Sequence, residues 1–176
     1  FDEAALKIPE WRKRNRHYHR LMEKYHAFFI PPHSRVLELG CGMGDLLAAV
    51  NPSYGVGIDF SPRIIGIAKE RHPGLTFHVM DAENLSFEET FDYIILSDRG
   101  ISRDIAPVPS LLAVSAIHHH LIDKRKRMQI DIVVESAEPR EVMHFALLFG
   151  YGASIINPYM CFAVIDRLVK DKAIQL

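Results

Sequence analysis

The sequence contains little cysteine and almost no net charge. Its two cysteines, Cys41 and Cys161, can form neither a disulfide framework nor a cysteine-rich metal centre, so a reducing, cytoplasmic setting is expected. The formal net charge of -1 gives no overall field that would attract nucleic acid or an anionic membrane, and neither is expected as a partner. The sequence also lacks an apolar run long enough to cross a bilayer, and its N-terminus lacks the cationic-then-apolar order of a signal peptide. These absences favour a globular domain with one apolar core.

Charge is concentrated locally in two basic stretches. Residues 11–20 read WRKRNRHYHR, and residues 124–127 read KRKR. One interpretation is a phosphate-binding patch. The interpretation that we favour is a solvated face of an amphipathic helix in the first case and a basic loop after a helix in the second.

Strand patterns and helix patterns alternate along the whole chain. Strict alternation is typical of a parallel sheet that helices cover on both faces. We therefore expect a single α/β domain over residues 1–176, a three-layer, doubly wound fold with a mainly parallel sheet. Ser61 is expected to cap one helix, with Pro62 in its first turn. Strands are expected at residues 36–39, 54–58, 75–79, 91–96, 128–134 and 154–156, and helices at residues 10–29, 45–50, 62–71, 109–123, 139–149 and 159–169.

The first strand runs into a turn with three closely spaced glycines, in the sequence VLELGCGMGD at residues 36–45. In an open α/β sheet the ligand lies beyond the carboxyl ends of the strands, where bare backbone allows close approach. Asp45 occupies the slot where a dinucleotide fingerprint has its third glycine. Glu38 would repel a pyrophosphate but would suit an ammonium group. The turn therefore favours a ligand with an amino-acid end over a dinucleotide.

Two further acids follow the next two predicted strands. Asp59 could accept both hydroxyls of a ribose. Asp81 could accept the exocyclic amino group of adenine, while the backbone amide of Ala82 could donate to a ring nitrogen. An amino-acid end, a ribose and an adenine together describe S-adenosylmethionine.

Residues 15–97 resemble the Rossmann-like S-adenosylmethionine-dependent methyltransferases. The matching pieces are VLELGCGMGD, YGVGIDFSPRIIGIAKER, LTFHVMDAENLSF and FDYIILSD. The resemblance implies methyl transfer to a small-molecule acceptor that the sequence does not identify. The implied cofactor residues are Glu38, Gly40, Cys41, Gly42, Gly44, Asp59, Phe60, Asp81, Ala82 and Ser97, with Phe60 packing against the adenosine.

From about residue 94 the chain resembles a different family, the central domain of the large subunit of glutamate synthase. The pieces LSDRG, PSLLAVSAIHHHLI and VVESAEPREVMHFALLFGYGA carry this likeness. It implies a scaffold without catalytic residues of its own. We interpret the chain as a chimera, with a methyltransferase-like half at residues 1–97 and a glutamate-synthase-like half at residues 98–176. Because both halves offer βα units of one handedness, we expect one sheet of order 3-2-1-4-5-6 without an antiparallel final strand.

Few residues qualify for chemistry. Three adjacent helical residues, His118 to His120, point in different directions and cannot converge on one ion, so no metal site is expected. Asp98 is the one candidate base, although a solvated loop acid is the interpretation that we favour. No catalytic residue is assigned. Three functions stay open: a methyltransferase, a cofactor-binding or designed chimera without turnover, and a structural domain of the glutamate synthase type.

Overall fold

The computed structural model describes residues 16–80, 90–99 and 107–174. Six strands form one sheet in the order β3-β2-β1-β4-β5-β6, and all five strand pairings are parallel. The predicted strand order is confirmed, and the described part of the sheet ends without an antiparallel strand. The strands are β1 (Arg35–Leu39), β2 (Tyr54–Asp59), β3 (Thr76–Val79), β4 (Tyr93–Ser97), β5 (Asp131–Glu135) and β6 (Ile155–Asn157).

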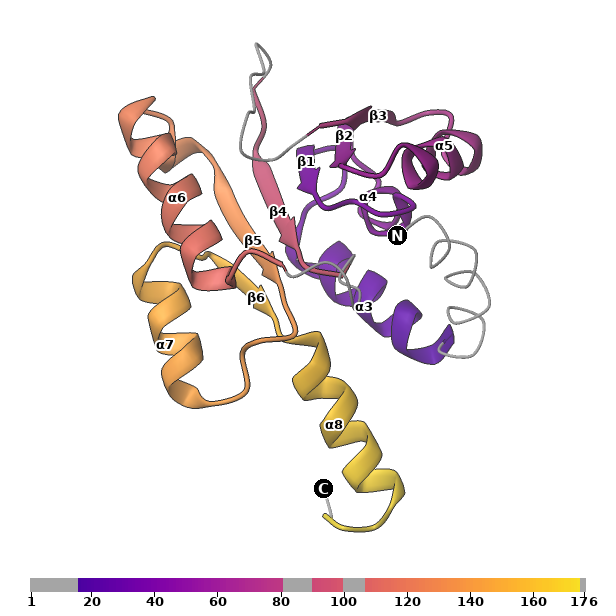
Figure 1. The fold of residues 1–176 in the computed structure, drawn as a ribbon, viewed down its shortest axis with the longest axis vertical. Helices are drawn as coiled ribbons and strands as arrows, with labels where there is room; N and C mark the ends of the chain where they lie inside the picture. Colours follow the sequence, from indigo (N-terminus) through magenta and orange to yellow (C-terminus); the bar gives the residue numbers. More distant parts are fainter. Residues whose placement is uncertain (1–15, 81–89, 100–106, 175–176) are drawn as a thin grey trace.

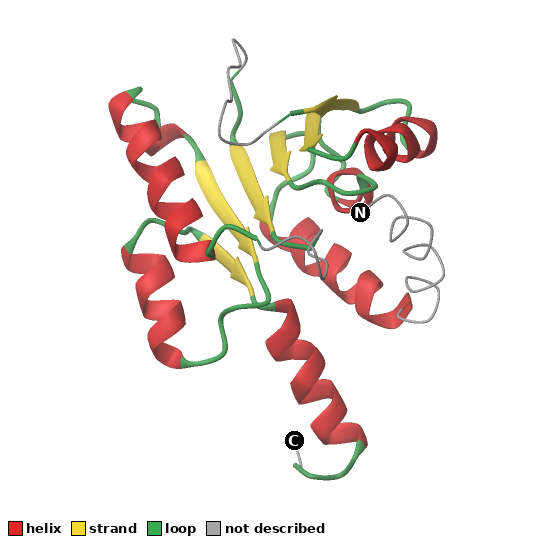
Figure 2. Cartoon of the chain, in the orientation of Figure 1, coloured by secondary structure: helices red, strands yellow, loops and turns green. Residues whose placement is uncertain are grey.

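Helices lie on both faces of this sheet, which makes the expected three layers (Figures 1 and 2). One face packs against α6 and α7, and the other packs against α3, α4 and α5. The last helix, α8, extends away from the sheet toward the C-terminus (Figure 1). The helices are α3 (Arg16–Phe29), α4 (Asp45–Ala49), α5 (Pro62–Arg71), α6 (Ser110–Asp123), α7 (Val142–Gly150) and α8 (Tyr159–Lys170).

The central strands are apolar on both sides because both of their faces are covered. In β1, Leu37 and Leu39 face the α6–α7 layer, while Val36 faces the α3–α5 layer. A strand buried on both faces reads as a nearly continuous apolar run, which is why VLEL and IDIVV were recognisable in the sequence. The two polar exceptions in these runs, Glu38 and Glu135, are therefore conspicuous.

Two predicted elements begin about three residues later in the structure than expected, and one of them is the helix expected at residues 139–149, which begins at Val142. The strand expected at residues 128–134 begins only at Asp131, and a short 3₁₀ turn, η2 (Arg127–Gln129), precedes it. The guanidinium of Arg127 donates to the carbonyls of Ile130 and Gly152, at 2.8 and 2.7 Å, and this holds the turn against the α7–β6 loop. Arg127 is thus structural and not part of a solvated basic loop. The first part of the helix expected at residues 10–29 lies outside the described residues.

The two sequence halves meet inside the sheet. Strand β4 pairs with β1 on one side and with β5 on the other. Leu96 of β4 therefore lies between Leu39 of β1 and Val134 of β5. The backbone ladder therefore continues across the join, while the division of the chain near residue 97 stays a prediction. Among the described helices, none combines the length and apolarity needed to cross a bilayer.

Candidate functional site at the carboxyl ends of the strands

The glycine turn after β1 is closed tightly onto β2. The backbone N–H groups of Gly40 and Cys41 both donate to the carbonyl of Ile58, at 2.9 and 3.0 Å. Gly40 has a φ of 77°, and a Cβ built on it would overlap the backbone carbonyl of Ser97. Gly42 and Gly44 also have positive φ, so the turn requires backbone conformations that side chains disfavour. The local sequence G-C-G-M-G is therefore explained by backbone geometry before any ligand is considered.

Asp59 connects the end of β2 to this turn. Its carboxylate accepts the N–H of Gly42 at 3.1 Å and the N–H of Ser61 at 3.0 Å. Burial raises the pKa of Asp59, and hydrogen bonds from the backbone of Ser61, Gly42 and Phe60 partly offset that rise. Phe60, the next residue, is half exposed. The structure thus brings the glycine turn and Asp59 together, with Phe60 next in the chain. Each oxygen of a carboxylate can accept more than one hydrogen bond, so Asp59 can bind a ligand as well as the backbone.

Glu38 lies beneath the turn, on the α3 side of the sheet. It is buried, and its Oε2 accepts the N–H of Leu47 in the first turn of α4 at 3.1 Å. Desolvation, followed by the nearby carboxylate of Glu135, raises the pKa of Glu38 well above its ordinary value. The role predicted for Glu38, holding an ammonium group, stays a prediction, and its observed partner is the N-terminus of α4.

The raised pKa of Glu38 predicts how stability depends on pH. A carboxyl that takes up a proton on folding stabilises the protein most below its unfolded pKa, near 4.5, and this stability is lost as the pH rises through the folded pKa. Between the unfolded and the folded pKa of Glu38, we expect the free energy of unfolding to fall by about 1.4 kcal/mol per pH unit because of this group. Glu38→Gln, which keeps an acceptor for Leu47, should flatten the slope and be more stable than wild type at pH 8.

Urea unfolding at pH 5, 6, 7 and 8 measures this effect. Glu70→Gln, at an exposed position on α5, is the matched control and should keep the wild-type slope. An unchanged slope in Glu38→Gln would show that Glu38 is ionised throughout this range.

The thiol of Cys41, in the glycine turn, packs in the core and is not reactive. It is buried among the residues of the α3–α5 layer. Burial, and then the carboxylate of Glu38, raise the pKa of Cys41, so the thiolate is disfavoured. The cofactor contact predicted for Cys41 stays a prediction.

Ser97, at the end of β4, and Asp98, which follows it, form hydrogen bonds with the end of β5 and the loop after it. The hydroxyl of Ser97 donates to Glu135 at 2.7 Å. Asp98 accepts three bonds, from the Ser136 hydroxyl at 2.7 Å, the Ala137 N–H at 3.0 Å and the Tyr159 hydroxyl at 2.7 Å. Asp98 is thus neither a free base nor a solvated loop acid, because its carboxylate ties the β5–α7 loop and the start of α8 to β4.

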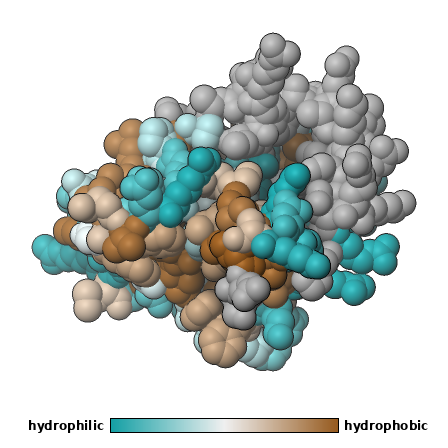
Figure 3. Space-filling view, turned by 90° about the horizontal axis from the view of Figure 1, so that it is seen from below, coloured by the Kyte–Doolittle hydropathy of each residue, from teal (hydrophilic) through white to brown (hydrophobic). Residues whose placement is uncertain are grey.

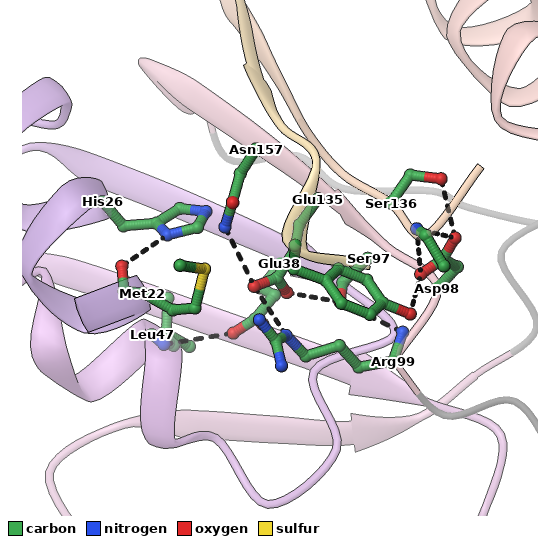
Figure 4. A network of polar contacts seen from close by, with 12 residues as sticks. Met22, His26, Glu38, Leu47, Ser97, Asp98, Arg99, Glu135, Ser136 and Asn157 are labelled. Atoms are coloured by element: carbon green, nitrogen blue, oxygen red, sulfur yellow. Dashed lines mark hydrogen bonds and ion pairs between the residues drawn. The ribbon is translucent and has the colours of Figure 1, made fainter. Parts of the chain in front are cut away.

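Glu135, Arg99 and Asn157 form a polar network on the α3 side, with His26 nearby (Figure 4). The sequence assigned no role in a site to any of them, and it placed Asn157, in Asn157-Pro158-Tyr159, only in the glutamate-synthase-like half. Glu135 is 1% exposed and pairs with Arg99 at 2.6 Å, while Asn157 donates to it at 3.4 Å. His26 lies above, its Nδ1 donating to the carbonyl of Met22 at 2.9 Å. One signal could have revealed part of it: Glu135 interrupts an apolar strand near its carboxyl end, as Glu38 does.

Several sequence predictions are not tested by this geometry. Asp81 and Ala82 lie outside the described residues, as do residues 11–15 of the first basic stretch. His118 accepts a bond from Arg127 at 2.9 Å, and His119 contacts the carbonyl of Ser115 at 2.8 Å, so these rings have separate partners. Within the described ranges there is no group of three or more histidine, cysteine or acidic residues that could hold a metal ion.

Two protein families match this chain. The family model of the glutamate synthase central domain matches residues 77–176, more than half of the chain, and that of a methyltransferase domain matches residues 37–99. The two matches overlap at β3 and β4. The large chain of glutamate synthase [NADPH] from Bacillus subtilis is 47% identical over 83 residues, which cover 47% of this chain but 6% of that protein. The ferredoxin-dependent glutamate synthase of Pyropia yezoensis is 51% identical over 71 residues, covering 39% of this chain and 5% of that protein.

The chain therefore spans only a small fraction of the curated relatives that it matches. Among solved structures, Streptomyces venezuelae DesVI aligns with a TM-score of 0.54 and 17% identity, covering 76% of this chain and 57% of that one. At this identity the likeness concerns the fold alone, and it agrees with the all-parallel 3-2-1-4-5-6 sheet. The chain has a Rossmann-like methyltransferase fold with a methyltransferase-domain match at residues 37–99, and through residues 77–176 it belongs to the glutamate synthase central domain family.

Proposed function

We propose that the chain binds S-adenosylmethionine across the carboxyl ends of β1, β2 and β3, and that it is a methyltransferase for a small-molecule acceptor. The observation that carries the proposal is the bond between Asp59 and the N–H of Gly42 at 3.1 Å. This bond supports the proposal because the carboxylate proposed to bind the ribose and the turn proposed to hold the methionine part are close enough to contact one ligand. The methyltransferase-domain match at residues 37–99 supports the same assignment.

The proposed contacts divide by the chemistry of the cofactor. The turn from Gly40 to Gly44 would lie against the methionine part, Asp59 would accept the ribose hydroxyls, and Phe60 would pack against the adenosine. Methyl transfer from a sulfonium depends mainly on alignment, so a base is optional. Both cysteines are free, which fits the reducing, cytoplasmic setting that we infer.

A structural role is the second candidate function, and the glutamate synthase family match favours it. The carboxylate of Asp98 is occupied by Ser136, Ala137 and Tyr159, so the carboxyl end of β4 offers no free base there. In this alternative the chain folds as a scaffold and turns nothing over.

Calorimetry with S-adenosylmethionine and S-adenosylhomocysteine separates the two candidates. Wild-type binding that Asp59→Ala abolishes supports the cofactor site, whereas equal binding by both proteins rejects the ribose assignment. Absence of wild-type binding favours the scaffold. Asp59 also stabilises the turn by accepting the N–H groups of Gly42 and Ser61. Asp59→Asn retains one acceptor oxygen, and it therefore serves to distinguish a lost ligand contact from a loosened turn.

Phe60→Ala tests the adenosine contact with little risk to the fold, because half of this side chain is exposed. Loss of one aromatic packing surface should weaken cofactor binding about tenfold, with the free energy of unfolding changed by less than about 0.5 kcal/mol. Val142→Ala, at an 86% exposed position on α7, is the matched control and should bind as wild type does. Equal affinity of Phe60→Ala and wild type would contradict the proposed contact.

A further inference from the structure

A concave site lies between α3, α8 and the α3-side face of β5 and β6, and its lining includes none of the proposed cofactor residues. Its volume is about 450 Å³, within the range of small-molecule sites. Aromatic and aliphatic side chains form most of its wall: Tyr25, Phe28, Phe29, Val133, Ile155 and Phe162. Figure 3 views the molecule from below, where α8 protrudes, and apolar surface gathers in the middle of this face with hydrophilic surface around it.

Two buried polar side chains also line this cleft, His26 and Asn157, which are 3% and 5% exposed. The amide nitrogen of Asn157 donates to Glu135, so its Oδ1 remains as an acceptor. Since the carbonyl of Met22 can only accept, Nδ1 of His26 carries the hydrogen, and Nε2 of the neutral ring presents a lone pair. Neither Oδ1 of Asn157 nor Nε2 of His26 has a hydrogen-bond partner among residues 16–80, 90–99 and 107–174. Figure 4 shows the amide of Asn157 pointing toward Glu135 and the ring of His26 bonded to Met22.

Unsatisfied buried acceptors are uncommon because each forfeits its bonds to water. Here the two residues that carry such acceptors both line one apolar cleft, so a ligand that enters it with a hydrogen-bond donor would supply the missing partner. Lone pairs on His26 and Asn157 disfavour an anion. Lys24 on the rim disfavours a cation, and the buried carboxylate of Glu135 is already paired with Arg99.

We propose that this cleft binds a neutral aromatic molecule that carries an N–H or O–H donor. The aromatic walls take up the ring, and the donor bonds to His26 Nε2 or Asn157 Oδ1. None of the residues that line this cleft is a proposed cofactor contact, although Asn157 bonds to Glu135, which also accepts from Ser97. The inference therefore does not depend on S-adenosylmethionine binding.

Indole and 1-methylindole are the matched probes, because they share a ring system and differ in the donor. Calorimetric titration of the full chain should give about tenfold tighter binding of indole, the difference that one hydrogen bond supplies. In the double variant His26→Phe/Asn157→Leu, the affinity for indole should decrease to that for 1-methylindole. The variant should bind 1-methylindole at least as tightly as wild type does. Retained binding of 1-methylindole then reports an intact cleft.

Phe162→Ala removes part of the apolar wall and should weaken both probes about fivefold, whereas Val142→Ala on the distant α7 should weaken neither. Failure of indole to saturate wild type overturns the proposal. Equal wild-type affinity for the two probes also overturns it, because the acceptors would then contribute nothing to binding. Unchanged indole binding in Phe162→Ala places the probe elsewhere and has the same consequence.

Discussion

Replacing Gly40 with alanine is expected to destabilise the protein by about 3 kcal/mol. A left-handed backbone costs an L-residue about 1–2 kcal/mol, and overlap with a fixed neighbour adds a similar amount. Gly40 has a φ of 77°, and the new Cβ would overlap the carbonyl of Ser97. That carbonyl belongs to backbone at the end of β4 and cannot rotate away as a side chain would. Urea unfolding of Gly40→Ala against wild type measures the loss.

Gly42→Ala is the matched control for this prediction. Gly42 also has a positive φ, of 52°, but a Cβ on it would meet nothing within 4 Å. It should therefore cost only the conformational part, about 1 kcal/mol. Equal losses in the two variants would show that backbone conformation alone, and not the contact with Ser97, makes Gly40 necessary.

Arg99→Met is expected to destabilise the protein by about 3–5 kcal/mol, because removing one partner strands a buried charge. Glu135 is 1% exposed, and Arg99 lies 2.6 Å from its Oε1. Methionine keeps an apolar stem beside Tyr159, over whose ring the guanidinium lies at 4.5 Å. Glu135 raises the pKa of the nearby Glu38, and Arg99 lowers it. Removing the charge of Arg99 should therefore raise the pKa of Glu38 further.

The double variant Arg99→Met/Glu135→Gln should recover most of the lost stability, because a neutral amide needs no counter-ion. Arg167→Met is the control for simple loss of an arginine, since Arg167 and Asp171 form an exposed pair with 83% and 61% of their side chains accessible. It should change the free energy of unfolding by less than about 1 kcal/mol. Thermal or urea unfolding of wild type, Arg99→Met, the double variant and Arg167→Met tests this prediction, and a double variant no more stable than Arg99→Met would contradict the stranded-charge explanation.

Most elements were predictable because their signals are local. Ser61 accepts the N–H of Ile64 at 3.3 Å and caps α5 as its sequence indicated, and the glycine turn follows β1 where expected. The start of β5 was predicted wrongly because the turn before it depends on Arg127 reaching the carbonyl of Gly152, far along the chain. Sequence patterns carry no information on such a contact.

The sequence by itself determined the alternation of strands and helices, the strand order and the two family likenesses, because apolar periodicity, turn residues and βα handedness are properties of consecutive residues. Only the tertiary structure decided which polar groups meet. Asp98 binds the β5–α7 loop, Glu135 joins Ser97, Arg99 and Asn157, and His26 shares a cleft with Asn157. The physical reason is that parallel strands distant in sequence end at one edge of the sheet, so the partners of each carboxylate are set by register across strands and by burial.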